Sequence, residues 1–147
     1  MKLLHFRSVH DPTGNLTVPE IPFEVRNTFV IHDIPEGAQR CGHAHRELQE
    51  VVIAVSGSFD VEATDEHGPH WFTLNRATEG LYLNPEVWRR LTNFSGNAVA
   101  LVLASTPYDE ADYIRSYPEF LATLPALTED WFSKRRFQEV EAWKKTP

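Results

Sequence analysis

A pair of histidines held at fixed spacing between two glycines constrains this chain more than any other feature. Five residues separate Gly37 from His43, and one residue separates His43 from His45. Four residues then separate His45 from Glu50, and six separate Glu50 from Gly57. Residues two apart on a β-strand point to the same face, so the two imidazoles are predicted to project together into one cavity. The glycines suit tight turns at the strand ends. Glu50 lies past a bend, from which the next strand can bring it to the same interior.

The rest of the first 105 residues consists of short strand-like runs separated by turn-forming residues. Many short strands at this spacing are typical of a sandwich or barrel. The five fixed positions match the first signature of the cupin family, and the resemblance implies an all-β fold: a cupin jelly-roll barrel with short C-terminal helices. The expected strands include 29–31, 51–55, 59–62, 71–74, 80–83 and 99–103.

The pattern changes after Pro107, but no long linker interrupts the chain. We expect one cupin domain over 1–147, with the barrel at about 1–106 and a helical tail at about 107–147. Acidic residues from Asp109 indicate a helix start, and Pro118 is predicted to split this region into two short helices, the second beginning near Ser116. Thr128 is a plausible N-cap for a last helix. The tail is expected to pack on the barrel or on a sister subunit, a partner-binding helix being the alternative.

Composition excludes several classes of partner. A net charge of −7 argues against nucleic acid and anionic membranes, although a local arginine cluster could still bind a small anion. The N-terminus lacks the apolar region of a signal peptide, and no run is long and apolar enough for a transmembrane helix. The single cysteine, Cys41, excludes an intramolecular disulfide and fits a reducing compartment. A cytoplasmic protein is therefore expected.

The histidine pair leaves open whether a metal is bound. His43, His45 and Glu50 are a plausible ligand set for a first-row transition metal. Metal-binding cupins usually add a histidine after a later turn, where this chain has Arg89. A guanidinium cannot lose its proton to become a ligand and would repel a cation. We therefore expect no metal and an anionic substrate, a metal-dependent cupin enzyme being the alternative.

More specifically, the chain resembles the dTDP-sugar 3,4-ketoisomerases, small cupins that convert dTDP-4-dehydro-6-deoxyglucose to a 3-keto isomer. The resemblance covers about residues 3–122, and the matching blocks are Arg40 to His45, 80–88, 93–95, 103–105 and 108–120. It implies an isomerase that uses no metal and no other cofactor, binds a dTDP-linked nucleotide sugar, and forms homodimers with exchanged N-terminal strands. Such enzymes supply ketosugars for the aminodeoxysugars of surface polysaccharides, including the lipopolysaccharide O-antigen.

Three positions depart from the family pattern. The family commonly has glutamine where this chain has Glu50. The family's Arg-x-Tyr-Tyr is represented by Arg26, Asn27, Thr28 and Phe29, so that the arginine is kept and both phenols are absent.

The reaction implied by the resemblance suits imidazole chemistry. Moving a ketone from C4 to C3 through an enediol requires a proton taken from C3 and one delivered to C4, and imidazole titrates near neutral pH. We expect His45 to carry the proton between carbons with His43 as its partner, the reverse order remaining open. A non-catalytic sugar-nucleotide-binding cupin is a further alternative.

Further residues are expected to bind the substrate. Guanidinium groups match phosphate oxygens, and aromatic rings can stack on the base or sugar. Arginine at 89 is also the residue that the gluco-type isomerases carry, which favours a gluco product. The expected substrate-binding residues are Arg26, Arg40, Arg89, Tyr82, Trp88, Glu50 and Phe29.

Overall fold

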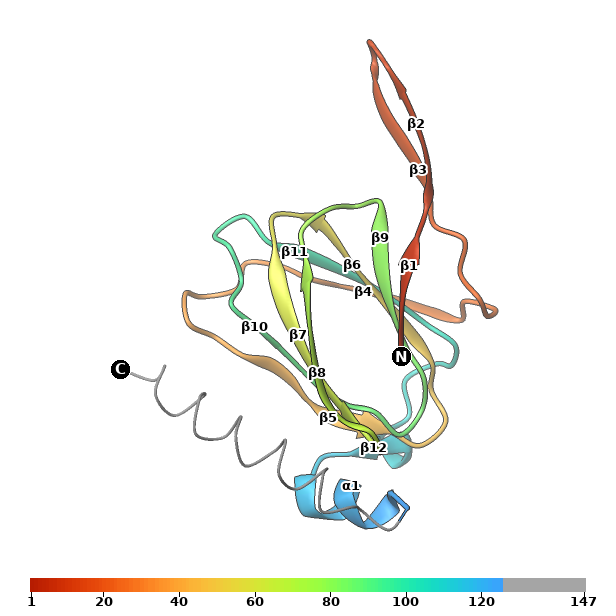
Figure 1. Ribbon diagram of the computed structural model, residues 1–147, viewed down its shortest axis with the longest axis vertical. Helices are drawn as coiled ribbons and strands as arrows, with labels where there is room; N and C mark the ends of the chain where they lie inside the picture. The colour runs from red at the N-terminus through yellow and green to blue at the C-terminus, as the bar shows by residue number, and fades with distance from the viewer. Residues whose placement is uncertain (126–147) are drawn as a thin grey trace.

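Two five-stranded β-sheets face one another and enclose the core of the protein (Figure 1). The computed structural model describes residues 1–125. One sheet has the order β1-β9-β6-β11-β4 and the other β12-β5-β10-β7-β8. The strands are β1 (Lys2–His5), β4 (Asn27–Ile31), β5 (Arg40–His45), β6 (Glu50–Ser56), β7 (Phe59–Asp65), β8 (Gly68–Leu74), β9 (Glu79–Leu83), β10 (Trp88–Thr92), β11 (Val99–Ala104) and β12 (Tyr113–Ile114). The expected jelly-roll architecture is confirmed, as are the strands expected from residue 29 to residue 103.

Alternating burial along the strands explains why two sheets form. In β7 and β11, every second side chain is buried, which is the pattern of strands with one face on a core. The core between the sheets includes Val52, Phe59, Val61, Leu83, Leu91 and Val102. The same period places Arg89 and Leu91 of β10 inside the barrel and turns Trp88 and Arg90 outward. A buried arginine is thus inserted into an apolar interior, beside the histidine strand β5.

The segment after the barrel differs from the helix predicted there. It forms a 3-10 turn η1 (Glu110–Asp112) followed by β12, which pairs with the end of β5. The prediction that one helix covers Tyr113 and Ile114 is therefore wrong, because backbone pairing with β5 holds these two residues extended. The second short helix, α1 (Tyr117–Thr123), is confirmed with Ser116 as its N-cap. The helix predicted after Thr128 lies outside the described residues.

A hairpin near the N-terminus extends away from the two sheets (Figure 1). It consists of β2 (Arg7–Asp11) and β3 (Gly14–Val18), which pair only with each other within residues 1–125. Its side chains include the exposed Val9 and Leu16. In the same part of the chain, no helix is long and apolar enough to cross a membrane.

Candidate active site

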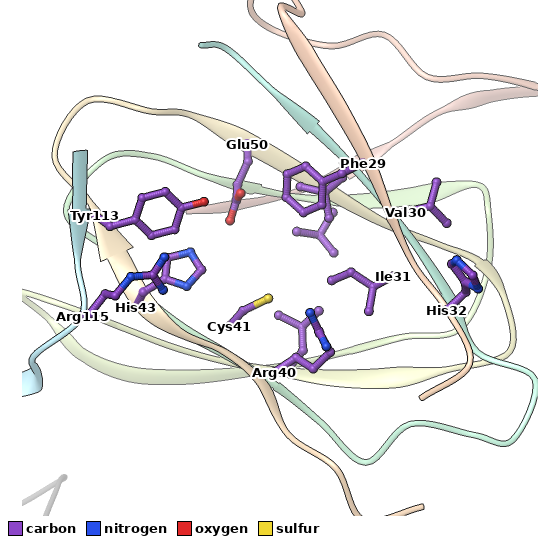
Figure 2. Close-up of a pocket in the computed structure, with 13 residues that line it drawn as sticks. Phe29, Val30, Ile31, His32, Arg40, Cys41, His43, Glu50, Tyr113 and Arg115 are labelled. Atoms are coloured by element: carbon purple, nitrogen blue, oxygen red, sulfur yellow. The ribbon is translucent and has the colours of Figure 1, made fainter. Parts of the chain in front are cut away.

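A pocket of about 390 Å³ opens between the two sheets. This size lies within the range typical of small-molecule sites. Figure 2 shows that Arg40, Cys41 and His43 from β5 face Phe29 and Ile31 from β4 across it, with Glu50 from β6 and Tyr113 and Arg115 at one end. The pocket is therefore lined by two histidines, two arginines, a phenol and a carboxylate, a set of groups suited to a polar, negatively charged ligand.

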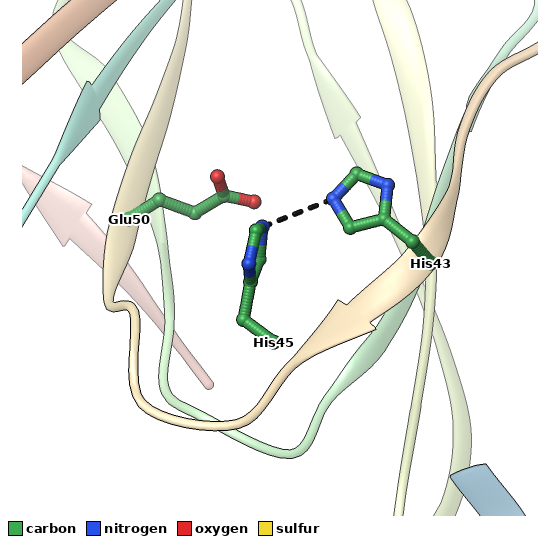
Figure 3. Close-up of side chains that lie close together, drawn as sticks. All are labelled: His43, His45 and Glu50. Atoms are coloured by element: carbon green, nitrogen blue, oxygen red, sulfur yellow. Dashed lines mark hydrogen bonds between the residues drawn. The ribbon is translucent and has the colours of Figure 1, made fainter. Parts of the chain in front are cut away.

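His43 and His45 lie side by side on the inner face of β5, as the sequence predicts (Figure 3). Their Nε2 atoms are 3.1 Å apart, and their rings meet edge to face. On its other side, His45 Nδ1 lies 3.0 Å from Asp112 Oδ2. The three groups form a hydrogen-bonded chain that runs from the pocket wall into the protein.

Asp112 is itself held by the turn that connects β5 to β6. Its carboxylate accepts hydrogen bonds from the backbone N–H groups of Glu47 and Leu48, at 2.7 and 3.2 Å, and its carbonyl accepts one from the N–H of Arg46. The carboxylate therefore acts as an acceptor with a fixed orientation. The turn that separates His45 from Glu50 in the sequence is thus tied to the aspartate that orients His45.

Both imidazoles are held neutral. Burial lowers the pKa of His43 from 6.5 to about 3, with the positive charge of Arg89 as the next cause. Burial also lowers the pKa of His45 to about 4, again assisted by Arg89 and opposed by Asp112. At neutral pH, the pair is therefore uncharged and able to accept a proton.

The hydrogen bonds fix which nitrogen of each neutral ring carries the proton. Because Asp112 accepts, His45 donates from Nδ1–H, and its Nε2 has a lone pair. The short contact between the two Nε2 atoms then requires His43 to donate from Nε2–H. His43 Nδ1 is left with a free lone pair, since no hydrogen bond within residues 1–125 uses it. Of the two rings, His43 lines the pocket, whereas His45 is 1% exposed.

An ion pair between Arg89 and Glu50 lies beside the histidines. Arg89 is fully buried and pairs directly across from His43 in the β10–β5 ladder, and its Nε is 3.2 Å from Glu50 Oε1. The ion pair lacks hydrogen-bond geometry, and all three guanidinium nitrogens are without an acceptor among the described residues. Buried donors without acceptors are costly, and Arg89 does not line the pocket, so the adjacent Glu50 carboxylate is what offsets its buried charge.

The candidate metal ligands do converge. One ligand atom from each of His43, His45 and Glu50 lies within 4.8 Å of the others. However, the Arg89 guanidinium contacts the same carboxylate and places a permanent positive charge next to all three groups. A cation would have to compete with this arginine for Glu50 and overcome its repulsion. The residues present therefore fit an anionic ligand better than a metal ion.

The expected binding residues fall into two groups. Phe29, Arg40 and Glu50 line the pocket, and Arg89 lies behind Glu50. The remaining three lie outside the pocket.

The structure accounts for each of the three. Trp88 packs on the outer face of β10 against Tyr117 and Phe120. Tyr82 donates a hydrogen bond to Gln49 in a separate apolar cluster. Arg26 is exposed and paired with Glu24. None of these three side chains is placed to contact a ligand bound in this pocket of the protomer.

Three residues at the site were not predicted from the sequence. Asp112, Tyr113 and Arg115 reach it because β12 adds to the edge of β5, placing Tyr113 opposite His45. The Tyr113 ring lies 4.9 Å from the His43 ring and 4.4 Å from the His45 ring, centroid to centroid. The block 108–120 resembles the ketoisomerase pattern, and this was the available signal that the segment serves the site.

Comparisons with known proteins agree on one group of relatives. The family model described as "FdtA: WxcM-like, C-terminal" matches residues 1–124. A TDP-4-oxo-6-deoxy-alpha-D-glucose-3,4-oxoisomerase from Aneurinibacillus thermoaerophilus is 37% identical over 123 residues, covering 81% of this chain and 88% of the relative.

Solved structures of 3,4-ketoisomerases are similar to this chain in both sequence and fold. The TDP-quinovose 3,4-ketoisomerase WlaRB of Campylobacter jejuni is 41% identical with a TM-score of 0.78, and the match covers 82% of this chain and 96% of that one. The sugar 3,4-ketoisomerase QdtA of Thermoanaerobacterium thermosaccharolyticum, solved with TDP, is 34% identical with a TM-score of 0.80, and the match covers 83% and 92% of the two chains.

Proposed function

Because this chain belongs to the FdtA family of TDP-4-keto-6-deoxyglucose 3,4-ketoisomerases, we propose that it moves the ketone of a TDP-linked 4-keto-6-deoxyhexose from C4 to C3. The observation that carries this proposal is the neutral imidazole pair, with one unused nitrogen at the wall of a pocket. An uncharged imidazole with a free lone pair, fixed in orientation, is able to take a proton from a carbon next to a carbonyl.

The exposure of the two rings supports His43 as the base, the reverse of the order expected from the sequence. The free lone pair on His43 Nδ1 takes the proton from C3, and the electron pair of the C3–H bond forms the C3=C4 bond of an enediol. Return of the proton to C4 completes its movement between the carbons. His45, hydrogen-bonded between His43 and Asp112, stabilises the positive charge that His43 carries between the two steps.

Fixed positive charge suits the diphosphate and the sugar oxygens. Arg40 and Arg115 line the pocket, and guanidinium groups bind phosphate oxygens through paired N–H donors. Arg89 lies behind Glu50 and does not line the pocket, so it would act on the substrate through its positive charge beside His43 and not by direct contact. The overall negative charge of the chain is therefore compatible with an anionic substrate.

Proton NMR of TDP-4-keto-6-deoxyglucose incubated with the purified protein tests the proposed function. We expect the substrate signals to be replaced by those of a TDP-3-keto-6-deoxyhexose, without added metal or other cofactor. An unchanged substrate in the presence of protein that binds TDP would contradict the enzyme function and favour a binding module.

Replacing Asp112 with asparagine is expected to lower kcat on the order of 10²-fold with little change in KM. An asparagine amide can donate to His45 Nδ1, which favours the tautomer that breaks the His45–His43 hydrogen bond. Steady-state kinetics of Asp112→Asn measure this effect, and an unchanged melting temperature separates it from a merely structural defect.

Asp109→Asn is the matched control for that substitution. Asp109 lies in the same segment and accepts a hydrogen bond from the N–H of Ala111, but it has no contact with either imidazole. We expect wild-type kcat from this variant. Equal losses in the two variants would contradict an orienting role for Asp112.

A homodimer is proposed on two surface features. The β2–β3 hairpin exposes Val9 and Leu16, at 53% and 64%, and the edge strand β4 exposes Val30 at 52%. Exchange of N-terminal strands with a second copy would cover such apolar surface. Light scattering is expected to give about twice the chain mass of 16.9 kDa, and Val9→Asp with Leu16→Asp to shift this to the monomer. A monomeric wild-type mass would contradict the dimer.

The finer details of the pathway are also proposals. Arg89 and the 41% identity to a quinovose-type isomerase support a product with the gluco configuration at C4, which the same NMR experiment reports. A TDP-linked ketosugar is an activated intermediate for aminodeoxysugars of the O-antigen type. Together with the single cysteine, this supports a cytoplasmic location.

A further inference from the structure

The isomerisation needs two proton transfers, and the imidazole pair accounts for one of them. The proton on carbon moves from C3 to C4, while a second proton must leave the C3 hydroxyl oxygen and reach the C4 oxygen. The second transfer requires a group that is protonated at neutral pH, because it donates first. Neutral His43 serves as the base for carbon and is therefore not available as this acid.

We propose that Tyr113 is a catalytic residue whose hydroxyl exchanges the oxygen-bound proton between O4 and O3 of the sugar. This inference rests on the proposed function. Tyr113 lines the pocket, and Figure 2 shows its hydroxyl directed across the pocket toward Glu50, beside His43. No hydrogen bond within residues 1–125 engages that hydroxyl, so it is free to meet a substrate oxygen.

The position of the Tyr113 ring is fixed from several sides. Its backbone pairs with His45, and its ring contacts both imidazoles. The Arg115 guanidinium lies 4.3 Å from the ring centroid and is itself anchored by two hydrogen bonds to Glu110, at 2.6 and 2.9 Å. A phenol held in this way keeps its hydroxyl close to the histidine base, as transfer of two protons on one substrate requires.

The electrostatic surroundings keep the phenol protonated. Burial raises the pKa of Tyr113 above its usual value, and the negative charge of Glu50 raises it further. Among the described side chains of the pocket, the Cys41 thiol is the other candidate acid, since burial raises its pKa to about 11. A thiol is the weaker hydrogen-bond donor, which favours the phenol of Tyr113.

The two transfers balance without any external reactant. When His43 takes the C3 proton, the C4 carbonyl oxygen takes the proton of Tyr113, giving an enediol, an imidazolium and a phenolate. The phenolate then takes the proton from the C3 hydroxyl, the C3 carbonyl forms, and C4 receives the proton of the imidazolium. Both side chains return to their starting states.

Tyr113→Phe tests this inference by steady-state kinetics, with TDP binding and thermal melting measured in parallel. We expect kcat to fall about 100-fold while KM and TDP affinity stay at wild-type values. Tyr108→Phe is the matched control, because this phenol contacts Tyr113 at 5.6 Å between ring centroids but is 64% exposed and bonded to Glu110. A wild-type kcat in Tyr113→Phe would overturn the role of Tyr113. So would a loss of kcat in Cys41→Ala but not in Tyr113→Phe.

Fluorotyrosine supplies a second measurement if Tyr113→Phe fails to fold. Incorporating 3-fluorotyrosine throughout the protein lowers the pKa of every phenol with little change in size. We expect the fall in rate at high pH to occur at a lower pH than in the unlabelled enzyme. The same fall at an unchanged pH would overturn the proposal. A wild-type enzyme without any isomerase activity would instead contradict the proposed function itself.

Discussion

Replacing His43 with glutamine is expected to lower kcat for the ketoisomerisation by about 10³-fold. Glutamine can keep a side-chain hydrogen bond to His45 but offers no basic nitrogen toward the pocket. The free Nδ1 lone pair of His43 is the only unengaged imidazole nitrogen of the pair within the described chain. Stopped assays followed by NMR or by separation of the two ketosugars measure the loss.

Two measurements keep this prediction specific. The affinity for TDP is expected to remain at the wild-type value, because we propose that arginines, and not the base, hold the nucleotide. His67→Gln is the control, since His67 lies on the surface in the β7–β8 connection. A His43→Gln enzyme that retained wild-type kcat would contradict the assignment of the base.

Replacing Glu50 with leucine is expected to lower the free energy of unfolding by about 3–5 kcal/mol. The guanidinium of Arg89 is fully buried and has Glu50 as its counter-charge, so the substitution leaves a buried charge without a partner. Glu50→Gln is expected to cost less, because the amide oxygen still faces Arg89. Urea unfolding at neutral pH measures both values.

A double variant and a surface pair serve as controls for the Glu50 prediction. Adding Arg89→Met to Glu50→Leu removes both charges and is expected to restore most of the lost stability. Arg90 lies on the outer face of β10, next to Arg89 in the sequence, and forms a half-exposed ion pair with Glu62. Glu62→Gln breaks this pair, and its expected cost in stability is below about 1 kcal/mol. If Glu50→Leu alone were as stable as the wild type, the buried charge could not be as isolated as the structure indicates.

The convergence of His43, His45 and Glu50 could be predicted from the sequence because its geometry is local. His43 and His45 are two residues apart on one strand, and Glu50 begins the next strand after a four-residue turn. Strand period and turn position are enough to bring the three groups together. The position of Arg89 is not local in this sense: it depends on the pairing of β10 with the histidine strand and was expected only from the family resemblance.

The places of Asp112 and Tyr113 in the site could not be predicted in the same way, because long-range strand pairing decides them. Asp112 contacts His45 across 67 positions of the sequence, and Tyr113 is extended only because β12 pairs with β5. Local patterns around Asp109 instead favour a helix start, and the acidic residues do form one 3-10 turn. No short-range signal distinguishes that turn from the first turn of a longer helix.

The placement of Trp88 could have been corrected from the sequence alone. Adjacent residues on a strand point to opposite faces, so Trp88 and Arg89 cannot both face the pocket. With Arg89 inside, Trp88 must lie outside, where it packs against Tyr117 and Phe120 of α1. Tyr82 likewise faces away from the core, between the buried Leu81 and Leu83.

The central claim is that two neutral imidazoles, ordered by Asp112, provide a base at the pocket wall. Nitrogen-15 NMR of the histidine side chains between about pH 5 and pH 8 tests it most directly. We predict that His43 and His45 stay uncharged throughout, because their pKa values lie near 3 and 4, with the proton of His45 on Nδ1 and that of His43 on Nε2. Titration of either ring near its usual value of 6.5, or the opposite tautomers, would contradict this mechanism.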